Sequence, residues 1–350
     1  MEFMTNKKNR ISLSVIVLAV LVLISVLLPL PYYIETPGSA ENINEYVRVD
    51  NRENTHPGAY YLTTVAIQRG TPLSLAMAKF LPFREIISKE ELMGESDDQD
   101  YERISQYEMD SSENMAKKVA FDLAKKKYSF QFQGVYVMGV MKDSSFYNQL
   151  ATGDIVYQID NFKPQSSKEF IDYIKAKKVK DQITVHYKRD GQTNQVSGPL
   201  ILLGEPKRPG IGITLADKTQ IKTKEQVDFL TEEIGGPSGG LMFTLELYEI
   251  LSGEDLRQGR QVAGTGTIEE DGKVGSIGGI DKKIVAADKA GASIFFAPSE
   301  PINPELKKMY PDLLTNYEEA KRAGKKIKTK MKIVPVSNIQ EAMDYLKESK

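Results

Sequence analysis

A long, uncharged and mostly apolar stretch lies near the start of the chain. Residues 11–30 contain no charged side chain. A helix that rises about 1.5 Å per residue covers about 30 Å over this length, which matches the hydrocarbon core of a bilayer. We therefore predict a transmembrane helix over residues 11–31, preceded by a short segment, 1–10, whose residues 1–3 resemble a cloning scar.

Charge predicts the orientation of this helix. Lys7, Lys8 and Arg10 precede it, and the first charges after it are Glu35 and Glu41. The positive-inside rule places the N-terminus in the cytoplasm and the rest of the chain outside the cell. The alternative is a signal peptide cleaved near the small residues 36–40. The apolar stretch is longer than a usual signal peptide's, and no A-x-A site follows it.

Residues 32–127 have mixed patterns and form an N-terminal region. Residues 60–67 read as a strand, 89–114 are acidic and polar, and 115–127 read as an amphipathic helix. We interpret 89–114 as a solvated linker or helix surface. A calcium loop would need a glycine and a later glutamate at fixed spacing, which this run lacks.

Residues 128–204 predict a small β-rich module. Strands are expected over 134–140, 182–189 and 195–203, and residues 153–161 are expected to form a turn, a strand and a second turn. A short helix is expected over 144–150 and an amphipathic helix over 166–177. The order of these elements, with GVYV at 134–137 and GDIVYQIDN at 153–161, resembles a bacterial PDZ domain. PDZ domains bind extended peptides along a sheet edge. The resemblance implies a peptide site at Gly134, Val135, Tyr136 and Val137; the alternative is a PDZ domain that serves only as a spacer.

From residue 205 the pattern becomes α/β. Residues 210–215 and 226–230 are strand-like, while 241–251 are apolar on nearly all sides and predict a buried helix. Ser238 lies on a Gly-Pro-Ser-Gly-Gly turn at the start of that helix. Glycines allow close approach to a substrate, and a helix N-terminus favours negative charge beside the hydroxyl. Such a turn has the properties of an oxyanion hole.

A lysine is the natural base for this serine. The only histidines, His56 and His186, precede Ser238, and there is no cysteine. Residues 278–283, Gly-Gly-Ile-Asp-Lys-Lys, start a second helix, with Asp281 as the expected N-cap. Burial and the positive helix end lower the pKa of a lysine there, which leaves a free amine to take the serine proton. Of the two adjacent lysines, we expect one to be a solvated surface charge.

These stretches resemble the proteolytic domain of Lon-type Ser-Lys peptidases. The matching residues are P-S-G-G around Ser238, T-G-T-I from Thr265, and G-G-I-D-K-K-I-V-A-A-D-K-A-G over 278–291. The resemblance implies that Ser238 is the nucleophile, Lys283 the base, Thr265 its support, and Gly235 an oxyanion-hole residue through its backbone N–H. We place this α/β domain, of the α+β Lon type, at residues 205–350.

The complete order of anchor, PDZ domain and Lon-like domain resembles the PDZ-containing Lon-like proteases of Gram-positive bacteria. That implies a membrane-anchored extracellular serine endopeptidase that cleaves secreted peptides or unstructured segments. The resemblance to streptococcal members implies a competence or quorum-sensing pheromone as a substrate. The chain contains no G-x-x-x-x-G-K-[ST] motif, so we expect cleavage without ATP, and we predict no cofactor or metal.

Length, charge and histidine content narrow the classes of protein to which this chain could belong. A length of 350 residues fits two or three domains. A net charge of −2 does not indicate the strongly basic character that is typical of nucleic-acid-binding proteins. Two separated histidines without H-E-x-x-H disfavour a zinc peptidase. Two alternatives stay open: an anchored PDZ scaffold with a non-catalytic Lon-like domain, and a signal peptidase, in which the serine normally lies much closer to the anchor.

Overall fold

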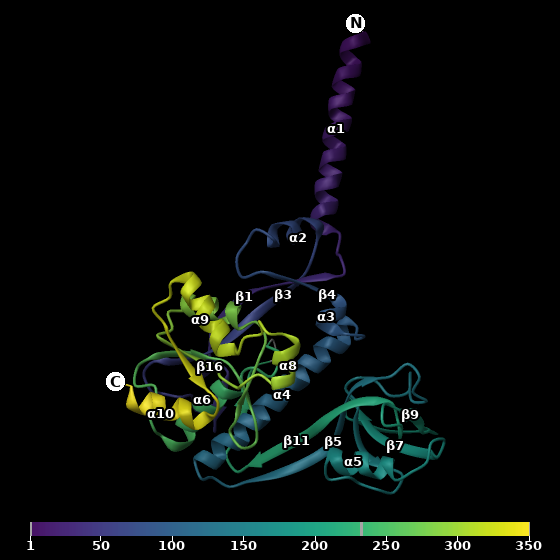
Figure 1. Ribbon diagram of the computed structural model, residues 1–350, viewed down its shortest axis with the longest axis vertical. Coiled ribbons are helices and arrows are strands. Elements are labelled where there is room, and N and C mark those ends of the chain that lie inside the picture. The colour runs from purple at the N-terminus through teal and green to yellow at the C-terminus, as the bar shows by residue number, and fades with distance from the viewer. Residues whose placement is uncertain (1, 232–233, 350) are drawn as a thin grey trace.

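The computed structural model describes residues 2–231 and 234–349, with side chains from residue 14 onward. Figure 1 shows helix α1 (Glu2–Leu27) projecting from one end of an α/β body, with a β-rich unit at the other end. Helix α1 ends before the predicted limit of residue 31, because Pro29 and Pro31 cannot continue its hydrogen bonding. Among the residues whose side chains are described, no helix is long and apolar enough to cross a bilayer. Residues 11–13 of the predicted span lie outside that set, so the span stays a prediction.

One mixed sheet contains strands from both the N-terminal and the C-terminal parts of the chain. Its six strands run in the order β17-β16-β13-β3-β1-β4. Strand β3 pairs antiparallel with β1, which pairs antiparallel with β4; β3, β13, β16 and β17 pair in parallel. Their bounds are β1 Tyr32–Asn42, β3 Ala59–Arg69, β4 Glu85–Ser88, β13 Gln261–Gly264, β16 Ile294–Pro298 and β17 Lys332–Val336. The predicted N-terminal region, residues 32–127, thus supplies three of the six strands. The helices that begin at the serine and lysine motifs pack against this sheet.

Helices cover both faces of this sheet. Helix α6 (Gly240–Ser252) packs on one face with α10 (Ile339–Glu348) and α4 (Asp98–Leu123), and residues 240–249 of α6 are all buried. Helices α7 (Ile280–Lys289) and α9 (Asn316–Ile327) form a second cluster on the other face. Successive side chains of β16 point to opposite faces of the sheet, which accounts for the two clusters. Phe296 belongs to the cluster under α6, and Phe295 belongs to the cluster under α7 and α9. The predicted buried helix over 241–251 is confirmed.

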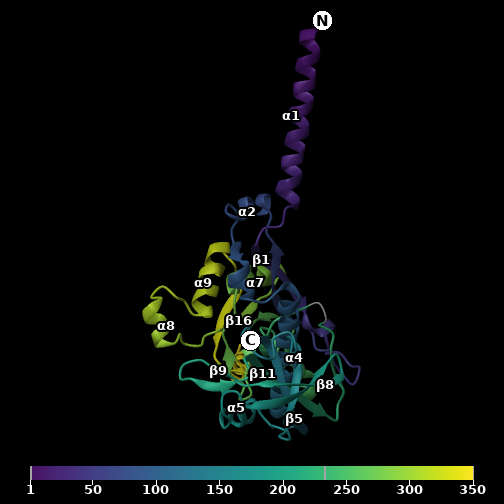
Figure 2. The same cartoon turned by 90° about the vertical axis from the view of Figure 1, so that its right-hand side faces the viewer.

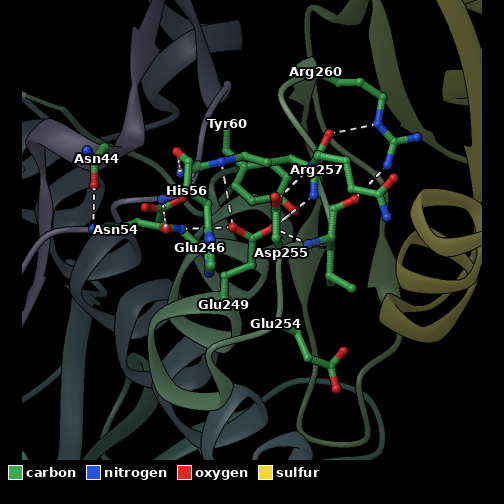
Figure 3. A network of polar contacts seen from close by, with 12 residues as sticks. Asn44, Asn54, His56, Tyr60, Glu246, Glu249, Glu254, Asp255, Arg257 and Arg260 are labelled. Atoms are coloured by element: carbon green, nitrogen blue, oxygen red, sulfur yellow. Dashed lines mark hydrogen bonds and ion pairs between the residues drawn. The ribbon is translucent and has the colours of Figure 1, made fainter. Parts of the chain in front are cut away.

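A polar network lies buried beneath α6 (Figure 3). Glu249 accepts hydrogen bonds from Asn54 Nδ2 and Tyr60 Oη, each at 2.8 Å. Arg257, 1% exposed, donates to Glu246 Oε2 at 3.0 Å. The network ties the segment before β3 to the helix that follows Ser238, since buried charges persist only where they are paired.

The β-rich unit has its own sheet and core. The strand order is β11-β5-β6-β7-β8, and the core includes Val135, Phe146 and Phe170. The elements are β5 Tyr128–Val140, β6 Ile155–Ile159, α5 Ser167–Lys175, β7 Gln182–Arg189, β8 Gln192–Pro199 and β11 Ile213–Thr223. Strand β11, from beyond the predicted limit at residue 204, pairs along the whole of β5.

The short helix predicted over 144–150 is wrong. That segment is a series of turns, in which Asn148 has a φ of 62°, a left-handed value that interrupts a helix. The Ser144 hydroxyl donates to the Ile211 carbonyl, which holds these turns against the segment before β11.

Helix α4 (Asp98–Leu123) connects the two units; it spans most of the predicted linker or helix surface, 89–114, and most of the predicted helix, 115–127. Asp97 caps it by accepting from Asp100 N–H at 2.8 Å. Tyr107 of α4 stacks on Tyr136 of β5 with ring centroids 4.1 Å apart, while another part of the helix packs on α6. Helix α4 therefore packs against both the β-rich unit and the α/β body, and is not exposed to water on all sides.

The remaining elements are short: η1 Ile43–Glu45, β2 Val47–Val49, α2 Pro72–Ala78, α3 Lys89–Met93, β9 Ile201–Leu203, β10 Arg208–Gly210, β12 Val227–Phe229, β14 Thr267–Ile268, β15 Val274–Gly275 and α8 Pro304–Met309.

Candidate active site

A tight turn presents Ser238 at the start of α6. Gly236 has a φ of 89°, a left-handed conformation that favours glycine. A side chain at Gly240, the first residue of α6, would place its Cβ 2.6 Å from Ile268 Cγ2, so only glycine allows this close packing. The Ser238 carbonyl accepts hydrogen bonds from Gly266 N–H at 2.9 Å and from Thr265 Oγ1 at 3.2 Å. The backbone of the serine is therefore fixed by the segment after β13.

Helix α7 brings Lys283 to this serine. Lys283 Nζ lies 2.6 Å from Ser238 Oγ and 3.0 Å from Thr265 Oγ1, and the residue is 4% exposed. The structure therefore places Ser238, Thr265 and Lys283 together, although 45 residues separate the serine from the lysine. The N-cap of α7 is Gly279, with a φ of 65°, and among the described side chains none caps this helix. The expectation that Asp281 is the cap is wrong, because Asp281 lies inside the first turn.

Burial changes the proton affinity of this amine. Removal from water lowers the pKa of Lys283 from 10.5 to about 7, and the nearby carboxylate of Glu35 opposes that effect only in part. An amine with a pKa near 7 is unprotonated in a substantial fraction of molecules at neutral pH. It can then accept a proton from the Ser238 hydroxyl.

Lys282 behaves in the opposite way. It is 2% exposed, and its Nζ lies 2.7 Å from Glu85 and 3.3 Å from Glu35. Burial lowers its pKa, but the hydrogen bond to Glu85 and the charges of Asp281, Glu85 and Glu35 outweigh burial and raise the pKa well above its ordinary value. The expectation that one lysine of the pair is a solvated surface charge is therefore wrong: both are buried, one neutralised by carboxylates and one beside the serine.

A cleft of about 1370 Å³ opens onto Ser238 and Lys283. Strand β3, the first half of α4, the serine turn and residues 276–278 line it. Gly235 lies on its wall beside the serine, and Gly236 N–H donates to the Ser105 carbonyl of α4 at 2.9 Å. The Ser112 hydroxyl donates to the Pro237 carbonyl at 3.0 Å. Helix α4, which was predicted in part as a linker, thus holds the serine turn; the apolar positions within its acidic stretch are the signal that indicates this role.

The predicted peptide site on β5 is not available for strand addition. Residues 134–137 all pair with β11, and Val135 and Tyr136 also pair with β6. A strand paired on both edges cannot accept a third partner. The edge strands of this sheet are β11 and β8, and Gly212 precedes β11 with a φ of 71°. The glycine-rich segment 210–213 is the signal that sequence reasoning missed.

Helix α4 covers the second half of the β11 edge. Tyr107 Oη donates to the Asp217 carbonyl at 2.7 Å, and Ile221 N–H donates to Asn114 Oδ1 at 2.8 Å. Helix α5 also packs beside β11. An added strand therefore has room at the start of β11 rather than along its whole length.

Comparison with protein families identifies both units. Residues 107–200 match the PDZ domain family, and residues 233–348 match the Lon protease (S16) C-terminal proteolytic domain. The chain therefore carries a PDZ domain followed by a Lon-type proteolytic domain.

Two curated Lon proteases are similar to part of this chain. The Lon protease of Neorickettsia sennetsu is 28% identical over 110 residues, which is 31% of this chain and 11% of that protein. The Lon protease of Chloroflexus aggregans is 31% identical over 107 residues, again 31% of this chain and 11% of that protein. The chain thus matches about a tenth of the length of these relatives. The PDZ domain of the SdrC-like protein from Listeria monocytogenes is 41% identical, with a TM-score of 0.24, and covers 25% of this chain and 90% of that one.

Proposed function

We propose that this protein is an ATP-independent serine endopeptidase in which Ser238 is the nucleophile and Lys283 the general base. The observation that carries the proposal is the 2.6 Å distance between Lys283 Nζ and Ser238 Oγ in a buried site. A nucleophile within hydrogen-bond reach of a base with a pKa near the working pH is the arrangement that acyl transfer requires. The chain itself contains no Walker A motif, which supports cleavage without ATP.

The geometry supports the following sequence of steps. The neutral Lys283 amine takes the Ser238 proton while Oγ attacks the peptide carbonyl, and the resulting ammonium returns a proton to the leaving amine. Water then hydrolyses the acyl-enzyme with the same amine as base. Thr265 Oγ1 holds the lysine amine in position at 3.0 Å. We propose that Gly235 N–H stabilises the oxyanion, since Gly235 lies beside the serine on the cleft wall.

Peptide cleavage tests the proposal. Purified full-length protein is incubated with a mixture of unstructured peptides, and products are read by mass spectrometry. Ser238→Ala and Lys283→Met should each abolish cleavage, whereas Lys289→Met, an exposed lysine on the same helix, should cleave at the wild-type rate. Absence of products from the wild-type protein would favour the non-catalytic scaffold, and full activity of either site variant would exclude the dyad.

We also propose that α1 anchors the protein in the cytoplasmic membrane with the catalytic domain outside the cell. The uncharged residues 11–30 and the positive residues before them support this, as do the side chains of residues 15–18, which are 50–62% exposed. External protease added to intact cells should digest the domains but leave the N-terminus protected. Full protection of the catalytic domain would contradict the orientation.

Secreted peptides and unstructured segments are the proposed substrates, with competence or quorum-sensing pheromones as one class. Support comes from the open cleft and the absence of an unfolding motif in this chain. Synthetic pheromones should be shortened by the wild type and left intact by Ser238→Ala. Cleavage of folded proteins at an equal rate would contradict the substrate class.

The PDZ domain is proposed to hold an extended peptide along the start of β11 beside α5. Amide hydrogen exchange in the presence of a bound peptide should show new protection at residues 211–216. Protection confined to 134–137 would contradict this placement.

A further inference from the structure

The connection between β3 and β4, residues 70–84, exposes an apolar stripe. We call this segment the apolar loop. Leu73, Met77 and Phe80 are 43%, 50% and 88% exposed. Their spacing of i, i+4 and i+7 places them on one face of α2 and the turn that follows it. Soluble helices normally turn such a face toward a core, so this stripe lacks the covering that its sequence pattern calls for.

Helix α2, which carries most of the stripe, has a well-capped N-terminus. Thr71 and Ser74 make a reciprocal capping box at its start, and Pro72 occupies the first helical position, where proline is favoured. Ala78 on the opposite side is 3% exposed, so the loop already packs on its body through another face. The exposed stripe is therefore a second face of an ordered element.

The apolar loop lies at the base of α1. Leu30 N–H donates to the Gly70 carbonyl at 2.9 Å, and Gly70 N–H donates to the Tyr32 carbonyl at 2.7 Å. Both Figure 1 and Figure 2 show α2 next to the end of α1, at the same end of the molecule. Leu27 and Tyr32, 64% and 43% exposed, continue the apolar surface from α1 to the loop.

The charge of the loop suits a lipid surface. Lys79 and Arg84 are the only charged residues between 70 and 84, and both are exposed. A lysine beside an apolar stripe can reach anionic headgroups while its neighbours enter the acyl boundary. Aromatic side chains such as Tyr32 are favoured at that boundary. An acidic residue in the loop would oppose this arrangement, and none is present in its sequence.

We propose that the apolar loop inserts its Leu73, Met77 and Phe80 stripe into the interfacial layer of the bilayer that α1 enters. This rests on the proposed anchoring by α1 and adds a second point of attachment. Two attachments fix the tilt of the body against the membrane. Ile67, three residues before the loop, lines the cleft, so the cleft is held near the lipid surface, where membrane-associated peptides reach it.

The absence of cysteine makes a direct test possible. The full chain is reconstituted into phosphatidylcholine–phosphatidylglycerol vesicles with one cysteine carrying an environment-sensitive fluorophore. Ala76→Cys, exposed beside the stripe, probes the loop and leaves Phe80 in place. Ile16→Cys probes α1, and Tyr310→Cys, 62% exposed on the body, is the matched control. Nitroxide lipids report contact with the bilayer, and iodide reports contact with water.

The inference predicts a blue-shifted Ala76 probe that is quenched by nitroxide lipid and protected from iodide, while the Tyr310 probe shows the reverse. Adding Phe80→Ser should reduce the lipid quenching at Ala76 and leave the Ile16 signal unchanged. A lipid-quenched Ile16 probe with an iodide-quenched Ala76 probe would overturn the inference alone. Both probes in water would overturn the anchoring proposal as well. An Ala76 probe protected from iodide but not quenched by lipid would indicate a second copy or another protein, which also overturns the inference.

Discussion

Replacing Lys283 by methionine should stabilise the fold while removing activity. Methionine keeps most of the volume and does not carry a charge into the buried site. Folding lowers the pKa of Lys283 from 10.5 to about 7, and each unit of that difference corresponds to about 1.4 kcal/mol. Burying the Lys283 ammonium therefore lowers the free energy of unfolding of the wild type by up to about 5 kcal/mol. Loss of the hydrogen bonds to Ser238 and Thr265 offsets about 1 kcal/mol of this gain.

The sign of the pH dependence follows from proton binding. Between pH 7 and 10.5 the unfolded chain holds a proton on Lys283 that the folded protein has released. The stability of the wild type therefore rises with pH over this range, while the contribution from residue 283 is absent in Lys283→Met. The advantage of the variant should be largest below pH 7 and should shrink toward pH 10.5.

Thermal unfolding of the full chain in mild detergent, followed by circular dichroism from pH 6 to pH 10, measures this difference. Lys289→Met, an exposed residue on the same helix, should show no pH-dependent difference from wild type. A Lys283→Met variant that is less stable than wild type at pH 6, or a stability difference that does not change with pH, would refute a buried amine with a lowered pKa.

Three further substitutions test the surroundings of the site. Lys282→Gln removes the charge that neutralises Glu35, which should raise the pKa of Lys283 and move the pH–rate profile to higher pH. Arg257→Met leaves the buried carboxylate of Glu246 unpaired and should cost about 3–5 kcal/mol of stability, with a larger loss at higher pH because burial raises the pKa of this group to about 7. Ser112→Ala removes one of the hydrogen bonds that hold the serine turn to α4 and should lower kcat/KM about tenfold or more, while stability falls by about 1 kcal/mol.

Matched variants control these measurements. Lys282→Arg keeps the charge and should restore much of the wild-type pH profile. Arg322→Met and Gln106→Ala alter exposed positions on α9 and α4 and should change neither stability nor rate. An unshifted profile in Lys282→Gln, an undiminished melting temperature in Arg257→Met, or wild-type kcat/KM in Ser112→Ala would each contradict the corresponding interaction.

Local sequence patterns predicted the elements that carry the chemistry. The glycine turn and the apolar run after Ser238 indicate the start of a buried helix, and the glycines before Lys283 indicate another. Both signals are local, since they depend on periodicity and on residues that tolerate special backbone angles. The hairpin turn at Asp190 and Gly191 follows from the same rules and is present, with φ values of 49° and 77°.

Long-range pairing was not predictable in this way. The sequence could not show that β1 and β4 bring Glu35 and Glu85 to Lys282, because both glutamates lie 197 residues or more before the lysine. The edge position of β11 depends on its pairing with β5 across the PDZ domain. The acidic pattern of residues 89–114 indicates a solvated linker or helix surface and does not show that α4 packs against both units, because its partners α6 and β11 lie far away in the sequence.

The pH dependence of covalent labelling at Ser238 tests the central claim most directly. A peptidyl fluorophosphonate is reacted with the full-length protein from pH 5.5 to pH 9, and the adduct is located by mass spectrometry. We predict a single adduct on Ser238, with a rate that rises with an apparent pKa of about 7 and is lost in Lys283→Met. An adduct on another residue, or a rate unaffected by Lys283→Met, would contradict the Ser238–Lys283 dyad.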